Sequence, residues 1–250
     1  MIKGVLLDIG GVLYEGDKVI EGAIEAVNSL RKNYKVRFLS NTSRIPPQSL
    51  VERLRGFGFE VEESELFTAL SAAKLFLMSQ KSSAFVVATK EAKSYFEDLQ
   101  FEQKYVLICD AYKEFTYDNL NTAFRYLEEG YGFLATNLNR YFKDGDGKLS
   151  LDAGGFVKAL EYASQREAKV LGKPNCEFFS LAIQSMDLSK EEVVMVGDDI
   201  ESDILGAKSC WLKTALVKTG KFREQDLYKA KPDILIESIA QLPTKLKEIE

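Results

Sequence analysis

The stretch VLLDIGGVLY, residues 5–14, begins with a short apolar run that ends at an acidic residue, Asp8. A run of this kind is typical of a strand buried inside a protein. Residues 36–39 (VRFL, apolar apart from Arg37) and 193–196 (VVMV) form similar runs, and polar residues follow each within two positions. The pattern predicts buried strands that carry polar side chains at their carboxyl ends.

Helical patterns lie between these runs. Apolar residues recur with helical spacing at residues 23–30, 50–57 and 178–186, and further strand patterns occupy residues 214–217 and 234–236. Strands that alternate with helices are typical of a parallel sheet covered by helices. We therefore expect an α/β fold with a doubly wound, Rossmann-like parallel sheet.

Residues 70–167 have a strand and helix pattern of their own. We therefore expect them to form an inserted α/β domain, within a core made of residues 1–69 and 168–250. Inside the insert, residues 137–155 are rich in Gly, Asp and Asn, which predicts a loop or hairpin. The DGDG segment at residues 144–147 lacks the glycine and glutamate that a calcium loop needs further on, so we interpret it as a solvated turn.

The composition excludes several kinds of site. The 250 residues contain no histidine, which rules out Ser-His-Asp triads and histidine-bound zinc. The net charge is −5 with both signs interspersed, so no basic patch points to nucleic acid. Metal ligands must come mainly from carboxylate and carbonyl oxygens, which favour Mg²⁺.

The chain shows no sign of export or of membrane insertion. No apolar run is long enough to cross a bilayer, and the first residues lack the features of a signal peptide. The three cysteines, Cys109, Cys176 and Cys210, are isolated and odd in number. We therefore expect reduced cysteines in a cytoplasmic protein.

Four polar clusters follow four predicted strands of the core. They are Asp8, Ser40-Asn41, Lys173 after the run at Val170-Leu171, and Asp198-Asp199. In an open parallel sheet, ligands bind at the carboxyl ends of the strands. We therefore expect these widely separated segments to converge on one crevice.

Taken in chain order, the segments resemble the motifs of the haloacid dehalogenase superfamily of phosphatases: DIGGVLY (8–14), SNTS (40–43), GKP (172–174) and GDDIESD (197–203). The resemblance covers nearly the whole chain. The insert lies between the second and third motifs, where one branch of the superfamily carries a large α/β cap. The resemblance thus implies a C2-type cap at residues 70–167.

The resemblance also implies a role for each motif. Asp8 is the expected nucleophile, forming an aspartyl-phosphate, and Lys173 offsets the negative charge of Asp8 and phosphate. Ser40 and the Asn41 backbone amide are expected to hold phosphate oxygens. The alternatives are structural: a strand-end Asp often caps the next turn, and Ser-Asn is common in turns.

The expected metal ion is Mg²⁺, bound by Asp8, the Gly10 carbonyl, Asp198 and Asp203. Whether Asp203 binds the ion directly or through water stays open. Asp199 is expected to act in the shell around these ligands. For Asp199 and Asp203, helix capping is the alternative interpretation.

In the cap, Asp152, Gly154 and Gly155 are candidates for a loop that faces the substrate, with helix capping as an equal alternative. The resemblance implies a small phosphorylated substrate and no nucleic-acid or membrane partner. It leaves open a homodimer formed through the cap.

Position 10 departs from the usual superfamily motif, which has a second Asp two residues after the nucleophile. Gly10 cannot protonate a leaving group, and a positioned general acid contributes roughly 10²- to 10⁴-fold to a rate. We therefore expect activated substrates, such as pyrophosphate, P–N compounds or aryl phosphates. The alternatives are a phosphatase of sugar or nucleotide monoesters, and a weakly active or non-catalytic phosphate-binding regulatory protein.

Overall fold

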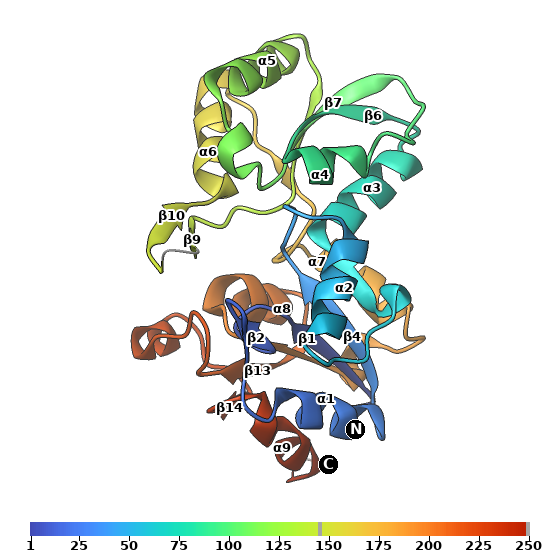
Figure 1. Cartoon of the computed structure of the whole chain (residues 1–250), viewed down its shortest axis with the longest axis vertical. Coiled ribbons are helices and arrows are strands. Elements are labelled where there is room, and N and C mark those ends of the chain that lie inside the picture. The colour runs from blue at the N-terminus through green and yellow to red at the C-terminus, as the bar shows by residue number, and fades with distance from the viewer. Residues whose placement is uncertain (145–146, 249–250) are drawn as a thin grey trace. The chain divides into compact units, whose positions relative to one another are not determined.

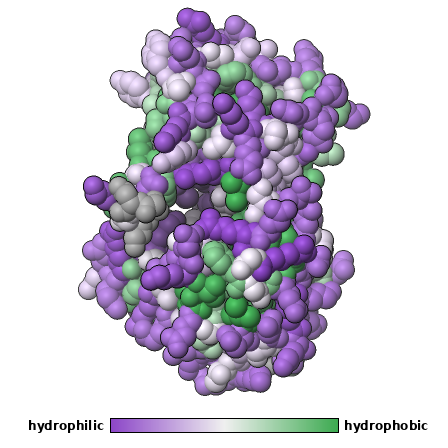
Figure 2. Space-filling view, in the orientation of Figure 1, coloured by the Kyte–Doolittle hydropathy of each residue, from purple (hydrophilic) through white to green (hydrophobic). Residues whose placement is uncertain are grey.

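The computed structural model describes residues 1–144 and 147–248. The turn predicted at residues 144–147 includes two residues outside this description. Among the described residues, no helix is both long enough and apolar enough to cross a membrane. The face of the molecule in Figure 2 is mainly hydrophilic, with smaller apolar areas.

The chain forms two compact units. The first contains Met1–Ser40, Val51–Phe67 and the chain from Lys173 onward, and the second contains Asn41–Leu50 and Thr68–Gly172. The second unit thus includes the short segment 41–50 in addition to the region in which the sequence predicts an insert.

The first unit is built on a six-stranded sheet with the order β14-β13-β12-β1-β4-β5 (Figure 1). Its strands are β1 (Gly4–Asp8), β4 (Lys35–Ser40), β5 (Leu66–Thr68), β12 (Val193–Gly197), β13 (Lys213–Val217) and β14 (Ile234–Ile236). Strands β1 and β12 are buried along their whole length, as expected for central strands of a covered sheet. The expected parallel α/β fold is confirmed.

The register brings the carboxyl ends of three strands together. Strand β1 pairs in parallel with β12 on one side and β4 on the other, so that Leu7 lies opposite both Val196 and Phe38. Asp8 follows Leu7 directly, whereas Ser40 and Asp198 lie two residues beyond Phe38 and Val196. All three polar residues therefore lie at the same edge of the sheet.

Helices and short turns connect these strands. The helices are α1 (Ala23–Arg31), α2 (Pro47–Gly56), α7 (Cys176–Gln184), α8 (Gly206–Ser209) and α9 (Leu242–Glu248). The shorter elements are the hairpin strands β2 (Tyr14–Glu15) and β3 (Lys18–Val19), the 3-10 turns η1 (Glu63–Glu65), η3 (Lys190–Glu192), η5 (Glu224–Tyr228) and η6 (Ile239–Gln241), and a π-helical turn η4 (Ile200–Leu205). Helix α7 begins where the Asn175 side chain accepts a hydrogen bond from the Glu177 amide, and it buries Phe178 and Phe179.

The second unit has a four-stranded parallel sheet with the order β11-β8-β7-β6. Its elements are β6 (Ser83–Val87), β7 (Gln103–Ile108), β8 (Gly132–Ala135), β11 (Lys169–Val170), the hairpin β9 (Tyr141–Lys143) and β10 (Leu149–Leu151), helices α3 (Ala69–Ser79), α4 (Lys90–Ser94), α5 (Tyr117–Glu128) and α6 (Ala153–Ser164), and the 3-10 turn η2 (Tyr112–Glu114). Alternation along β7 sends Leu107 into one apolar cluster and Val106 and Ile108 into another. The sheet therefore buries both of its faces.

Two sequence-based expectations are wrong. The run at residues 170–171 was expected to be a strand of the core, but Lys169 and Val170 pair with Leu134 and Ala135 in the sheet of the second unit. The cysteines were expected to be reduced, but Cys176 at the start of α7 and Cys210 after α8 form a disulfide. The folded chain brings these two cysteines together across 34 positions of sequence, whereas Cys109 is free and buried.

Candidate active site

Asp8 lies where β1 ends at the carboxyl edge of the core sheet. Its backbone is fixed by pairing with β4, where it lies opposite Leu39. Only 8% of the residue is exposed, so water hydrates its carboxylate poorly. A buried carboxylate is stabilised by nearby positive charge.

Lys173 supplies that charge. Its ammonium group forms ion pairs with Asp8 and, at 2.7 Å, with Asp203, although only 2% of the residue is exposed. Burial lowers the pKa of Lys173, but the two carboxylates outweigh this and raise it above its ordinary value. Lys173 therefore stays protonated beside Asp8, even though it follows a strand of the other sheet.

The GDDIESD segment carries three acidic residues with different surroundings. Asp198 follows β12 directly and is 3% exposed. Asp199 caps the π-helical turn η4, since its Oδ1 accepts hydrogen bonds from the amides of Glu201 (2.9 Å) and Ser202 (3.1 Å). Asp203 lies within η4, and its Oδ2 accepts a hydrogen bond from the Asp199 amide at 3.2 Å.

Gly197 allows this arrangement because a side chain at that position has no room. A Cβ atom at residue 197 would lie 2.2 Å from Asp203 Oδ2. The glycine therefore lets the backbone at the end of β12 approach the Asp203 carboxylate.

Three carboxylates form a buried cluster with the chemistry of a magnesium site. Asp8, Asp198 and Asp203 each offer an oxygen, and these oxygens lie within 4.8 Å of one another. Burial, together with Asp8 and Asp203, raises the pKa of Asp198. Burial also raises the pKa of Asp203, to about 6, against the lowering effect of Lys173. Such crowding of negative charge among oxygen ligands fits a divalent cation.

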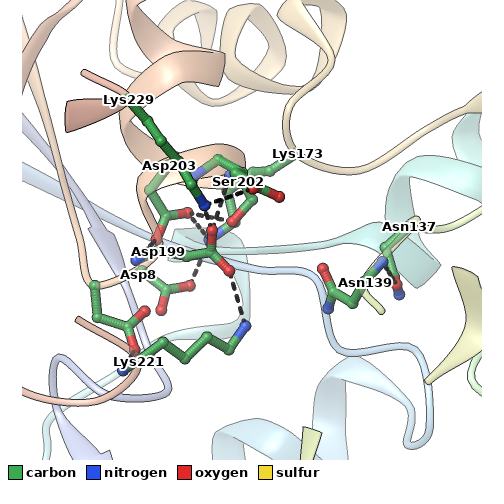
Figure 3. Close-up of polar contacts among 11 residues, drawn as sticks. Asp8, Asn137, Asn139, Lys173, Asp199, Ser202, Asp203, Lys221 and Lys229 are labelled. Atoms are coloured by element: carbon green, nitrogen blue, oxygen red, sulfur yellow. Dashed lines mark hydrogen bonds and ion pairs between the residues drawn. The ribbon is translucent and has the colours of Figure 1, made fainter. Parts of the chain in front are cut away.

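A further segment of the site was not predicted. Residues 219–221 follow β13, and each makes a contact at the edge of the cluster. The Thr219 hydroxyl donates to the Gly11 carbonyl, the Gly220 amide donates to Glu15 Oε1 at 2.6 Å, and the Lys221 amide donates to Asp198 Oδ2 at 2.8 Å. The Lys221 ammonium then reaches Asp199 Oδ2 at 3.1 Å (Figure 3). The sequence offered two signals for this segment: its place after a predicted strand, and the resemblance of TGKFR, residues 219–223, to the haloacid dehalogenase superfamily.

Comparison with known proteins agrees with this geometry. A family profile described as haloacid dehalogenase-like hydrolase matches residues 5–102, and a second, described as HAD-hydrolase-like, matches residues 170–242. The chain is 38% identical over 234 residues to phospholysine phosphohistidine inorganic pyrophosphate phosphatase of Xenopus laevis, covering 90% of this chain and 86% of that protein. The present chain belongs to the haloacid dehalogenase-like family and is one of its phosphatases. The resemblance seen in the sequence is thereby confirmed.

Other relatives place this phosphatase in the same group. It is 39% identical over 233 residues to haloacid dehalogenase-like hydrolase domain-containing protein 2 of Mus musculus, covering 92% of this chain and 90% of that protein. The 4-nitrophenylphosphatase of Thermotoga maritima superimposes with a TM-score of 0.90 at 25% identity, covering 97% of each chain. The p-nitrophenyl phosphatase of Archaeoglobus fulgidus gives 0.89 at 27% identity, covering 98% of this chain and 99% of that one. These matches confirm the fold of the phosphatase, including its inserted cap.

Positions 10 and 11 differ in whether a side chain larger than that of glycine could fit. A Cβ atom on Gly10 would meet nothing within 4 Å. Gly11 has a φ of +79°, and a Cβ there would lie 2.0 Å from Asp198 Oδ2. Gly11 is therefore required by the backbone of this phosphatase, whereas Gly10 leaves open space. Ser40, at the end of β4, is 9% exposed.

The remaining candidates belong to the second unit. The Asn41 carbonyl accepts a hydrogen bond from the Asn137 side chain at 3.3 Å. Asp152 is 5% exposed and caps α6, since its Oδ1 accepts from the Ala153 amide at 2.6 Å. A Cβ on Gly154 would lie 2.4 Å from the Leu138 carbonyl oxygen, so close backbone packing explains that glycine. Their roles toward a substrate stay predictions.

Proposed function

We propose that this phosphatase is Mg²⁺-dependent and uses the Asp8 carboxylate as its nucleophile on small activated phosphoryl compounds. One observation carries the proposal. The Asp8 carboxylate is buried, paired with the Lys173 ammonium, and clustered with two further buried carboxylates. This arrangement suits attack on phosphorus, because negative charge is concentrated where a cation and a phosphate would share it.

In the first step, an Asp8 oxygen forms a bond to phosphorus while the bond from phosphorus to the leaving group breaks. The leaving group takes the electron pair, and an aspartyl-phosphate remains. In the second step, the oxygen of a water molecule bonds to phosphorus and the bond to Asp8 breaks, with its electron pair returning to the carboxylate. Both hydrogens of the water leave with the departing orthophosphate. The site thereby returns to its starting state.

The residues around Asp8 support both steps by charge and position. Lys173 stays protonated and reduces the repulsion between Asp8 and the incoming phosphate. Asp8, Asp198, Asp203 and the Gly10 carbonyl would hold Mg²⁺, and Ser40 and the Asn41 amide would hold phosphate oxygens. When bound, Mg²⁺ supplies positive charge that offsets the charge developing on the transferred phosphoryl group.

The proposed substrate class follows from position 10. No side chain there can protonate the leaving group, so substrates whose leaving groups depart without a proton are favoured. Names of relatives agree, since one is called an inorganic pyrophosphate phosphatase and another a 4-nitrophenylphosphatase. We further propose that the cap restricts the site to small substrates.

A phosphate-release assay tests the mechanism. With Mg²⁺, the wild type should release phosphate from pyrophosphate and 4-nitrophenyl phosphate, and EDTA should abolish this. Asp8→Asn should lower kcat by at least about 10³-fold while the protein stays folded. Asp17→Asn is the matched control, because the Asp17 side chain is 95% exposed, and it should behave as wild type. An Asp8→Asn protein that keeps most of its activity would refute the nucleophile assignment.

A further inference from the structure

Two hydrogen bonds to carboxylates hold the backbone at Lys221, although the side chain of this residue is exposed. Its own amide binds Asp198 Oδ2 at 2.8 Å, and the preceding amide of Gly220 binds Glu15 Oε1 at 2.6 Å. Gly220 has no room for a side chain, because a Cβ there would lie 2.0 Å from Asp198 Oδ2. These contacts fix the starting point of the Lys221 side chain beside the carboxylate cluster.

The two lysines of the site differ in their access to solvent. The Lys173 side chain is 2% exposed and lies between two carboxylates, Asp8 and Asp203. The Lys221 side chain is 46% exposed and forms its ion pair with Asp199, whose side chain is 21% exposed. An ammonium group has three N–H donors, and the bond to Asp199 uses one. Lys221 is thus the cation that an incoming anion can reach.

The direction of attack decides on which side of phosphorus the leaving group lies. In phosphoryl transfer, the attacking and leaving oxygens lie roughly in line on opposite sides of phosphorus. Asp8 attacks from the buried end of β1. The leaving group must therefore lie on the side of phosphorus opposite Asp8, and a cation that contacts it there needs access to solvent.

We propose that Lys221 determines specificity by binding the leaving group when that group is itself a phosphate. The inference rests on the proposed function and names its substrate class, a phosphoanhydride such as pyrophosphate. When the bridging P–O bond breaks, the electron pair stays on the bridging oxygen and the departing phosphate gains negative charge. Lys221 keeps its proton and stabilises that charge through a charge-assisted hydrogen bond. Fixed positive charge thereby replaces the proton that position 10 cannot donate.

The test compares two substrates across matched variants. Lys221→Met removes the charge and keeps an unbranched apolar stem, and Lys221→Arg keeps the charge. Lys229→Met is the control, because Lys229 is similarly exposed, at 43%, and pairs with Glu201 and Asp226 in the same unit. For each folded protein, kcat/KM is measured with pyrophosphate and with 4-nitrophenyl phosphate, whose leaving group carries no phosphate.

We expect Lys221→Met to lower the ratio of pyrophosphate to 4-nitrophenyl phosphate kcat/KM by at least about tenfold, as for loss of a charged hydrogen bond. Lys221→Arg should keep most of that ratio, and Lys229→Met should leave it unchanged. In the inactive Asp8→Asn protein, Lys221→Met should also weaken binding of pyrophosphate more than binding of orthophosphate, measured by calorimetry.

The outcomes separate this inference from the proposed function. If the wild type hydrolyses neither substrate, the proposed function is wrong. If it hydrolyses both and Lys221→Met lowers both rates equally, the proposed function stands and the role of Lys221 is overturned. If Lys221→Met does not fold, Lys221→Gln decides by the same ratio.

Discussion

Placing an aspartate at position 10 should shift this phosphatase toward alkyl phosphates. The structure has room for the change, because a Cβ on Gly10 would meet nothing within 4 Å. The backbone also permits it, since the φ angle of Gly10 is not in the positive region that favours glycine. The neighbouring position behaves differently, since a side chain on Gly11 would collide with Asp198. Gly10→Asp should therefore fold, and its carboxyl group should lie near the bond that breaks.

The charge of the site should help the new group to act as an acid. Two residues along an extended chain span about 6.6 Å, so the new carboxylate and that of Asp8 would repel by about 2.5 kcal/mol at an effective dielectric constant of 20. A repulsion of this size raises the pKa of the new carboxyl group by nearly two units, before Lys173 and a bound cation reduce it. A larger share of the group is then protonated near neutral pH.

A general acid contributes roughly 10²- to 10⁴-fold when well positioned, and we expect at least about tenfold here, since the position has not been optimised. The measured quantity is the ratio of kcat/KM for an alkyl phosphate, such as glycerol phosphate, to that for 4-nitrophenyl phosphate. Gly10→Asn is the matched control, because it fills the same space without an acidic proton. An equal ratio in Gly10→Asp and Gly10→Asn, both folded, would refute our explanation of Gly10.

Two further predictions concern stability. Cys176→Ser should lower the free energy of unfolding by about 2–4 kcal/mol in urea denaturation, because the disulfide closes a loop across 34 positions; an unchanged midpoint under oxidising conditions would contradict this. The pKa of Asp233 is pushed up by burial, but hydrogen bonds from Thr214 and Lys208 bring it below its ordinary value. The ionised Asp233 side chain therefore stabilises the folded chain at pH values above its unfolded pKa. This stabilisation is lost as pH falls through the folded pKa. The Tm difference between wild type and Asp233→Asn should shrink below about pH 4, and a constant difference from pH 7 to pH 3 would contradict the assignment.

The core sheet could be predicted because its strands are buried on both faces. Continuous apolar runs such as residues 5–7 and 193–196 mark such strands without help from distant parts of the chain. The edge at which Asp8 and Asp198 meet then follows from the rule that parallel strands share one carboxyl end. The apolar runs and the rule on strand ends were therefore enough to predict that Asp8 and Asp198 lie close together.

The rest depends on contacts between distant residues that local patterns do not record. The strand before Lys173 has only the residues Lys169–Val170, and its partners Leu134 and Ala135 decide which sheet it joins. The cysteine pair likewise forms only because α7 and α8 pack together. Lys221 has no acidic or apolar signature, and it becomes significant through the Asp198 carboxylate beside its amide.

The charges of the site explain why its two lysines should have different tasks. Among the described residues, three of the site's four aspartates pair with two ammonium groups: Asp8 and Asp203 with Lys173, and Asp199 with Lys221. The fourth, Asp198, belongs to the carboxylate cluster. A divalent cation would offset the formal charge of these six groups, so their net charge alone gives no selectivity between substrates. Selectivity must then come from where each charge lies.

In the proposed mechanism, Lys173 is enclosed with Asp8 and would act on the transferred phosphoryl group of every substrate alike. The Lys221 side chain is 46% exposed, and in our proposal it discriminates between leaving groups by their charge. An acid at position 10 would discriminate differently, by supplying a proton to a leaving group that carries little charge of its own. A site with Lys221 and no acid is therefore suited to phosphoanhydrides, and a site with the acid and no lysine would be suited to alkyl esters.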